Sequence, residues 1–209
     1  VHGAIGLAYL AGWMLWGDPE RDVIEIARHH AVRARDLAPN DPLTYRLHGR
    51  LATVTRAFEE SKRHADRALR LDPNNADLIM AAALNDLFAG DIGNSRRLLE
   101  NVLEVHSDTA HLAEITRMWM SLTQFVMGDP TSAKATAGEI SGLDFMKNLL
   151  LAACHAALGE DVAARVRATA LLVEVPGFSV SRFGFLKCFR DPERAHALRD
   201  ALLKAGVPE

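Results

Sequence analysis

Histidine and cysteine are the residues of this chain that could form a metal site or supply a nucleophile. The chain has nine histidines and two cysteines, and His30 and His64 are 34 residues apart, so a repeated structure would place them equivalently on successive units. A zinc site needs about four ligands in a tetrahedral array, or three and a water molecule. No cysteine or carboxylate completes such a set by spacing. We therefore expect the histidines to be exposed on a polar face and no metal to be bound.

Cys154 and His155 place a thiol next to an imidazole in the sequence. A catalytic cysteine needs a base within hydrogen-bond reach, whereas adjacent residues of a helix point to different faces. The sequence also lacks a nucleophile elbow, a glycine-rich phosphate loop before a helix and an HExxH motif. We expect Cys154 and Cys188 to pack in the core. We also expect no cofactor and no enzymatic activity in this region.

The charge pattern argues against a nucleic-acid partner. The net charge is -3, and in the stretch EESKRHADRALR (residues 59–70) basic residues alternate with acidic ones. Phosphate binding needs a sustained positive surface instead. This stretch is typical of a solvated helix face, with Glu59 and Arg63 paired one turn apart.

Hydropathy and cysteine usage indicate where the chain resides. No apolar run reaches the roughly 18 residues that a membrane-spanning helix needs. Two cysteines flanked by apolar residues are typical of reduced thiols rather than of a disulfide framework. We therefore predict no membrane span and a cytoplasmic location.

A repeat of 34 residues defines the elements that must position any site. The stretches RARDLAPNDPL (33–43) and RALRLDPNNAD (67–77) both run from a helical pattern into a proline, and these prolines, Pro39 and Pro73, are 34 residues apart. That is the period of one helix-turn-helix unit. The same alignment superimposes small residues where two antiparallel helices would approach closely: Ala27 with Ser61, Ala31 with Ala65, and Ala34 with Ala68.

The clearest unit is YRLHGRLATVTRAFEESKRHADRALRLDP, residues 45–73. Its periodicity places two sets of residues on one face of a first and of a second helix: Tyr45, Gly49 and Ala52, then Phe58, Ser61, Ala65 and Ala68. The unit resembles the tetratricopeptide repeat (TPR) family, whose aromatic, glycine, alanine and terminal proline positions it fills in order. His48 departs from the family, which usually has leucine there.

Further helix pairs are predicted on both sides of this unit. The first comprises residues 4–16 and 23–37 around a turn at 17–20, and later pairs turn at 90–91, 128–130 and 159–161. Each turn combines glycine with an acidic residue or proline, which ends one helix and begins the next. Strand signals are absent. The predicted fold class is all-α, a TPR-like right-handed superhelix of about five repeats over residues 1–176 with a concave groove.

The pattern changes after Pro176. The segment GFSVSRFGFLKCF (177–189) carries four phenylalanines, at 178, 183, 185 and 189, and a last helix is predicted at 193–206. We expect residues 177–209 to be an aromatic segment and a capping helix of the same domain. Residues 189–209 also resemble the C-termini of bacterial TPR regions that follow class III adenylate or guanylate cyclase domains or winged-helix regulators. This resemblance implies that a larger signalling protein continues upstream, with a domain that could be catalytic.

The first helices of the units would line the groove. The candidate partner-binding residues are Arg46, Arg50, Thr53, Met80, Leu84, Leu87, Phe88, Met118, Leu122 and Phe125. This surface is basic at one end and rich in methionine and other apolar residues in the middle, which suits an amphipathic helix or an apolar peptide. Two alternatives are a groove filled by the chain's own elements and one covered by a second copy in a homodimer. We expect the two arginines to pair with acidic side chains at the surface.

These patterns predict a protein-interaction or regulatory module within a larger bacterial signalling protein. The alternative is a sensor domain that binds a short peptide or a small ligand in the same groove.

Overall fold

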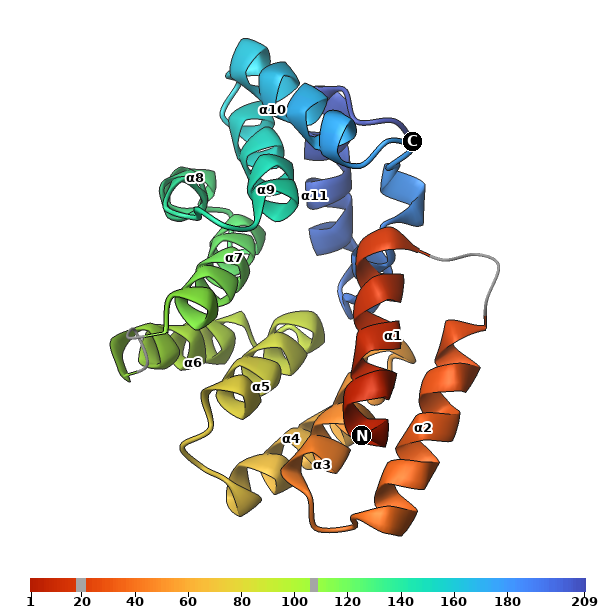
Figure 1. Cartoon of the computed structure of the whole chain (residues 1–209). Helices are drawn as coiled ribbons and strands as arrows, with labels where there is room; N and C mark the ends of the chain where they lie inside the picture. The colour runs from red at the N-terminus through yellow and green to blue at the C-terminus, as the bar shows by residue number, and fades with distance from the viewer. Residues whose placement is uncertain (18–21, 106–108) are drawn as a thin grey trace. The chain divides into compact units, whose positions relative to one another are not determined.

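The structure is a computed structural model that describes residues 1–17, 22–105 and 109–209 (Figure 1). These residues form eleven α-helices and two short 3-10 helices. In chain order they are α1 (His2–Trp16), α2 (Val23–Leu37), α3 (Pro42–Val54), α4 (Phe58–Leu71), α5 (Ala76–Ala89), α6 (Ile92–Val105), α7 (Ala110–Val126), α8 (Pro130–Gly138), α9 (Asp144–Ala157), α10 (Asp161–Glu174), η1 (Val180–Arg182), η2 (Gly184–Cys188) and α11 (Pro192–Ala205). The turn predicted at residues 17–20 lies outside the described residues except for Gly17.

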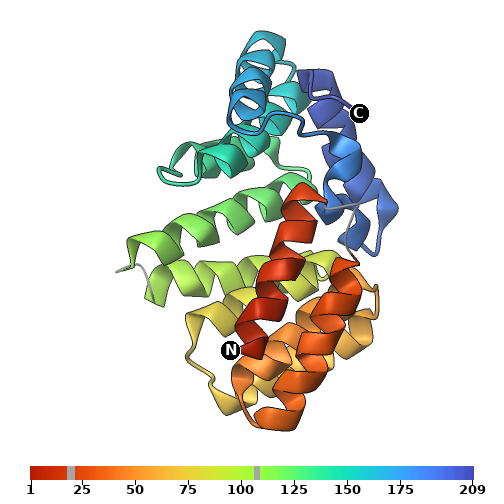
Figure 2. The same ribbon diagram turned by 45° about the vertical axis from the view of Figure 1, so that its right-hand side comes forward.

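Successive helices pack as pairs. Helix α1 contacts α2, α3 contacts α4, α7 contacts α8, and α9 contacts α10, and the members of each pair lie side by side in Figures 1 and 2. Pro39 and Pro73 lie just after the ends of α2 and α4, as the repeat alignment requires. The predicted fold class is confirmed: the described chain is all-α and consists of helix-turn-helix pairs of the TPR type.

Short polar side chains begin several of these helices. An aspartate or asparagine precedes the first helical residue and accepts a hydrogen bond from a backbone N–H of the first turn, which would otherwise be unpaired. Such caps are Asp22 on α2, Asp41 on α3, Asn75 on α5 and Asp129 on α8. Local sequence therefore sets the starts of these helices.

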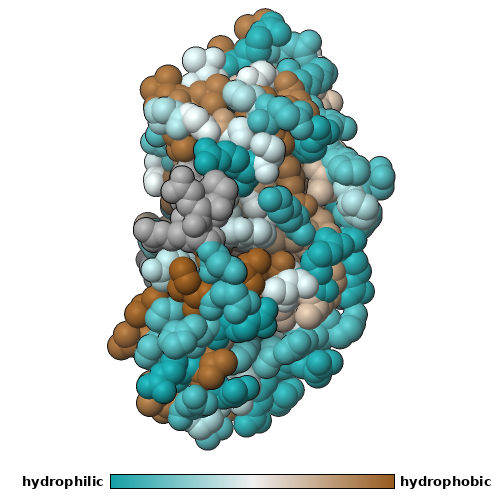
Figure 3. All heavy atoms as spheres, turned by 90° about the vertical axis from the view of Figure 1, so that its right-hand side faces the viewer, coloured by the Kyte–Doolittle hydropathy of each residue, from teal (hydrophilic) through white to brown (hydrophobic). Residues whose placement is uncertain are grey.

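The repeated small residues lie where helices meet. Ala27, Ala31 and Ala34 are buried on α2, and Ser61 and Ala68 are buried on α4. Most large apolar side chains are buried. On the face drawn in Figure 3, hydrophobic residues form separate patches between hydrophilic ones. Each helix pair thus has its apolar side covered by neighbouring elements.

Contacts divide the described chain into two compact units. Unit 1 consists of Val1–Ser95 and Arg182–Asp191, so it holds α1 to α5, the start of α6, and η2. Unit 2 consists of Arg96–Ser181 and Pro192–Glu209, so it holds the rest of α6, α7 to α10, and α11. The division into repeats at 1–176 and a terminal segment at 177–209 stays a prediction, and part of that segment packs in unit 1.

Candidate functional site

The most distinctive feature of unit 1 is a non-repeat segment that lies on its first helices. We call residues 183–190 the aromatic strap. It contacts α1 and α3 through η2, and it reaches α5 through Phe88. The rings of Phe185 and Phe189 each lie edge-on to Phe88, with centroids 5.0 Å away, and Phe183 stacks on Phe185 at 5.3 Å. Because all four rings are buried, the strap contributes a dense aromatic cluster to this face.

Two glycines let the strap region approach α1 at van der Waals distance. A Cβ atom on Gly184 would lie 2.5 Å from the carbonyl oxygen of Trp13. A Cβ atom on Gly17 would lie 1.9 Å from the carbonyl oxygen of Arg182, and Gly17 has a φ of 57°, which disfavours other residues. Any side chain at these positions would force the backbones apart. The close approach of α1 to residues 182–184 therefore depends on glycine at both contacts.

A pair of arginines fastens the end of the strap to the turn between α3 and α4. Arg56 donates hydrogen bonds from Nη1 to the carbonyl oxygen of Phe189 at 2.7 Å and to that of Lys187 at 3.2 Å. Arg190 forms an ion pair with Glu59 at 2.5 Å, and its backbone N–H donates to the carbonyl oxygen of Phe88 at 2.8 Å. The strap is thus held by backbone hydrogen bonds as well as by ring packing.

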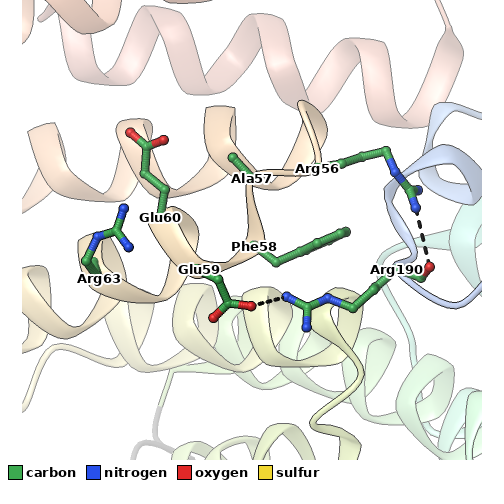
Figure 4. Close-up of a pocket in the computed structure, with 7 residues that line it drawn as sticks. All are labelled: Arg56, Ala57, Phe58, Glu59, Glu60, Arg63 and Arg190. Atoms are coloured by element: carbon green, nitrogen blue, oxygen red, sulfur yellow. Dashed lines mark hydrogen bonds and ion pairs between the residues drawn. The ribbon is translucent and has the colours of Figure 1, made fainter.

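Both guanidinium groups also contact the same ring. Figure 4 shows the ring of Phe58 between Arg56 and Arg190, and the guanidinium carbons lie 5.6 Å and 4.7 Å from its centroid. These distances are in the range of cation–π attraction. We call this set the arginine latch: Arg56, Phe58, Glu59 and Arg190. The expected pairing of Glu59 with Arg63 is replaced by that of Glu59 with Arg190.

The backbone of Arg56 is in an unusual conformation. Its φ is 65°, and it is the one non-glycine residue with positive φ in the described chain. Side chains other than glycine rarely adopt this left-handed region, and asparagine or aspartate is the usual exception. The conformation directs the guanidinium toward the carbonyl groups that end the strap. Such an outlier indicates that surrounding contacts hold the residue in place.

An open hollow of about 450 Å³ lies beside the latch. Its lining residues are Arg56, Ala57, Phe58, Glu59, Glu60, Arg63 and Arg190, drawn in Figure 4. Three guanidinium groups and two carboxylates share this small surface, so it has no strong excess of either charge. Its chemistry suits a polar, zwitterionic contact rather than an anion site.

Burial shifts the pKa values of two groups beneath the strap, the thiol of Cys188 and the guanidinium of Arg50. Cys188 is fully buried, and burial raises the pKa of its thiol to about 12, against the opposite effect of the nearby Arg50 and Arg56 guanidinium groups. A thiol with this pKa stays protonated and unreactive at neutral pH. Arg50 is half-buried, and burial lowers the pKa of its guanidinium to about 10, so it remains charged. Its Nη1 lies 3.7 Å from Sδ of Met14.

Only part of the predicted groove meets the strap. Phe88 contacts it directly, and Arg50 lies close to Cys188. On the same helix as Phe88, three further candidates are buried: Met80, Leu84 and Leu87. Arg46 lies outside this cluster and forms the expected surface pair, with its Nη1 3.9 Å from the carboxylate of Asp77.

Thr53 lies between helices rather than on an open surface. Its side chain is fully buried. The hydroxyl oxygen lies 2.8 Å from Oγ of Ser61 on α4, 3.0 Å from Oδ1 of Asn85 on α5, and 3.1 Å from the carbonyl oxygen of Gly49. This network joins α3, α4 and α5, so the structure gives Thr53 a role in helix packing.

The remaining candidates belong to unit 2. Met118, Leu122 and Phe125 are buried on α7. Helix α11 contacts α7, α9 and α10 in the same unit. Nη1 of Arg194 donates to the carbonyl oxygen of Val126 at 3.1 Å, and Nζ of Lys204 donates to that of Ala156 at 2.9 Å. The first helices of unit 2 are thus covered by α11.

Four of the histidines that the structure describes form two close pairs. Nδ1 of His2 lies 2.8 Å from Nδ1 of His30, and His48 stacks on His64 with centroids 5.1 Å apart. His30 and His64 are half-buried, so the expectation that the histidines are exposed is wrong for both. No group of three or more metal-ligating side chains occurs among the residues that the structure describes.

His48, the departure from the family pattern, has a structural partner. Its Nε2 lies 3.1 Å from the carbonyl oxygen of Ala31 on α2, which identifies Nε2 as the protonated nitrogen. Burial and the neighbouring His64 lower the pKa of His48. The imidazole therefore links α3 to α2 in its neutral form.

Cys154 lies in the core, as predicted. It is fully buried on α9, and burial raises the pKa of its thiol to about 12. His155 pairs with Glu160 instead of the thiol. In the described part of the chain, no helix combines the length and apolar character that crossing a membrane requires.

Reasoning from sequence missed the residues that hold the strap. The sequence candidates did not include Arg56, Glu59, Gly184 or Arg190. The turn at Arg56 and the strap are about 130 residues apart in the sequence, and only the fold brings them together. The sequence signal for this site was the cluster of phenylalanines. It predicted that the segment is buried but not which helices it packs against. Phe185 and Phe189 pack against Phe88, which is both a groove candidate from the sequence and part of this site in the structure.

Comparisons with known proteins support the fold alone. No protein-family model matches the sequence, and no curated protein matches it. Among solved structures, the chain is similar to PilF of Pseudomonas aeruginosa, with a TM-score of 0.64 and 14% identity over 98% of this chain and 87% of that chain. It is also similar to YrrB, described as a TPR protein with an unusual peptide-binding site, with a TM-score of 0.49 and 17% identity over 84% of this chain and 90% of that chain.

Proposed function

We propose that this chain is a protein-interaction module that binds an apolar peptide on the first helices of its TPR-like repeats. The observation that carries the proposal is the aromatic strap. In unit 1 the faces of α1, α3 and α5 hold a segment with no α-helix of its own through buried rings and backbone hydrogen bonds. A surface that accepts one such segment has the features that peptide recognition requires: apolar pockets and partners for backbone groups.

The expected binding energy comes mainly from aromatic side chains. Burying one large apolar side chain contributes roughly 1.5 to 3 kcal/mol, and hydrogen bonds to the peptide backbone set its position. Arg50 adds a positive charge beneath this face. We therefore expect partners with two or more aromatic residues in the segment that takes the position of the strap.

The larger context that we propose is a bacterial signalling protein. The resemblance of residues 189–209 to TPR regions that follow cyclase or winged-helix domains supports this context. In that case the repeats regulate the neighbouring domain through the partner that they bind. Sequencing the gene upstream of the codon for Val1 tests this part: a cyclase-like or DNA-binding domain would support it, and any other domain would contradict it.

Panning a random peptide-display library against the immobilised chain tests the binding function. We expect enrichment of aromatic peptides that bind with micromolar dissociation constants in solution. Arg50→Glu serves as the site variant, and Arg165→Glu, an exposed position on α10, is the matched charge control. A library that yields no specific peptide from several rounds would contradict the proposal. A thermal shift with small metabolites in place of peptides would favour the sensor alternative, since a ligand at roughly 100 times its dissociation constant adds about 2.7 kcal/mol of stability.

A further inference from the structure

The aromatic strap is bound to unit 1 in the manner of a peptide ligand. Its flanking residues belong to unit 2, and the chain joins unit 1 only from Arg182 to Asp191. Its two anchoring rings, Phe185 and Phe189, are four positions apart and are followed directly by the latch residue Arg190. The helices beneath it also pair among themselves, α1 with α2 and α3 with α4.

We propose that the aromatic strap is a tethered ligand of the unit 1 face, and that the partner of this face is a peptide with two phenylalanines four positions apart followed by arginine. This inference rests on the proposed function, because it names the occupant and the regulation of the same face. When the strap is bound, the face is closed to the partner. When the strap is released, Phe88, Glu59 and Arg56 offer the same contacts to a second peptide.

A competing peptide could replace the polar contacts that hold the strap on unit 1. Glu59, Arg56 and Arg190 are exposed, so their ion pair and hydrogen bonds are screened by solvent and are individually weak. A competing peptide with the same sequence pattern would replace each of them one for one. The strap has an advantage over a free peptide, because its covalent tether gives it a high effective concentration at the face. The intact chain therefore binds such a peptide more weakly than a chain with an opened strap.

Two independent changes open the strap without altering the ring pocket on α5. Gly184→Ala places a methyl group against the carbonyl oxygen of Trp13, at the 2.5 Å contact. Arg190→Ala removes the ion pair with Glu59 and the ring contact with Phe58 from the strap side, and it leaves the side chains of the unit 1 face unchanged. Gly12→Ala is the matched control, because a Cβ atom at this position of α1 meets no atom within 4 Å.

The strap carries its own reporter of opening. Cys188 is fully buried in the closed strap, and burial holds the pKa of its thiol at about 12. Release into water restores an ordinary thiol, so the rate of alkylation measures opening. Cys154 is equally buried in unit 2 and provides the internal reference in the same protein.

The experiment measures Cys188 alkylation by mass spectrometry, far-ultraviolet circular dichroism, and binding of a fluorescein-labelled synthetic peptide, RFGFLKSFRD. This peptide carries the sequence of residues 182–191 with Cys188→Ser. In the opened variants we expect alkylation of Cys188, but not of Cys154, to accelerate by at least ~10-fold. Peptide affinity should rise by at least ~10-fold over wild type and Gly12→Ala. A control peptide with Phe185→Ala and Phe189→Ala should not bind.

Three outcomes would overturn the inference. The first is an opened strap, shown by reactive Cys188 and unchanged helicity, without tighter binding of the peptide. The second is a Cys188 that stays unreactive in both opened variants, which would make the strap a permanent part of the core. The third is loss of helicity in both variants, which would make the strap a requirement for folding. In each of these cases, library peptides that bind wild type elsewhere on the first helices of the repeats would leave the proposed function standing.

Discussion

The two units cover the same kind of surface with different elements. In unit 2 the first helices are covered by α11, whose backbone hydrogen bonds are internal to the helix. In unit 1 they are covered by the aromatic strap, whose carbonyl groups need donors from elsewhere, and Arg56 supplies them. Backbone polar groups removed from water must be paired. A helix therefore makes a self-sufficient cover, whereas the strap depends on side chains of the unit that it covers.

The two units also differ in which element carries the cationic hydrogen-bond donor, the cover or the repeats beneath it. In unit 2 the cover itself supplies the cations, as Arg194 and Lys204 donate to carbonyl groups near the ends of α7 and α9. In unit 1 Arg56 of the repeat donates to the cover. Cations at helix C-termini also complement the helix dipole. The α11 cover thus stabilises the repeats that it covers, and the strap is stabilised by them.

Removing both covers should have the largest effect. Deletion of residues 178–209 exposes the ring of Phe88 in unit 1 and the apolar side chains of α7 and α9 in unit 2. Apolar patches of this kind drive association, so we expect the truncated chain to aggregate. Light scattering and size-exclusion chromatography measure this. A truncated chain that stays soluble and fully helical would show that neither element is a necessary cover.

A smaller change tests whether α11 is an integral part of unit 2. Leu202 is fully buried on α11, and Leu202→Ala leaves a cavity. We expect the free energy of unfolding, from urea titration, to fall by about 3 kcal/mol. Ala197→Ser, at an exposed position of the same helix, is the control and should have little effect. Equal stabilities of the two variants would mean that α11 is as exchangeable as we propose for the strap.

The Thr53 network tests the packing beneath the strap. Thr53→Val keeps the shape of the side chain but leaves Oδ1 of Asn85 without this partner. A buried polar atom that loses its partner costs about 2 kcal/mol, and we expect the free energy of unfolding to fall by that amount. Thr55→Val, at an exposed position just after α3, is the comparison and should cost less. A neutral effect of Thr53→Val would show that this hydrogen-bond network does not stabilise the packing of α3, α4 and α5.

Lowering the pH should have a smaller effect than these substitutions, and it should destabilise α2 and α3 of unit 1. Burial and His64 lower the pKa of His48 in unit 1 below its ordinary value of 6.5, so the folded state favours the neutral imidazole. The unfolded chain binds the proton first as the pH falls, and stability that is complete above about pH 6.5 decreases below it. His30 shifts in the same direction. We expect hydrogen exchange to increase in α2 and α3 between about pH 7.5 and pH 5.5.

His48→Leu is the matched variant for this prediction. It introduces the residue that the TPR family usually has at this position, and it removes the titrating group. We expect the acid-induced increase in exchange at α2 and α3 to become smaller than in wild type. An unchanged pH dependence would assign the effect to His30 instead.

Local sequence determined the helices. The periodic small residues, the aspartate and asparagine caps, and the 34-residue spacing of Pro39 and Pro73 all act within one helix or one helix pair. Such signals can be read without knowledge of distant contacts. They are the reason that the predicted start of the second helix at residue 23 and its end at residue 37 agree with α2.

Only the tertiary structure decided where the aromatic strap lies and what holds it. The strap has no helical period, and its partners are side chains about 130 residues away in the sequence, Arg56 and Glu59. The phenylalanines indicated that the strap would be buried, because exposed aromatic clusters are unfavourable. Their position on α1, α3 and α5 depends on the close contact of Gly184 with Trp13 and on the left-handed backbone of Arg56. Contacts of this kind arise from the folded arrangement, since no local propensity specifies them.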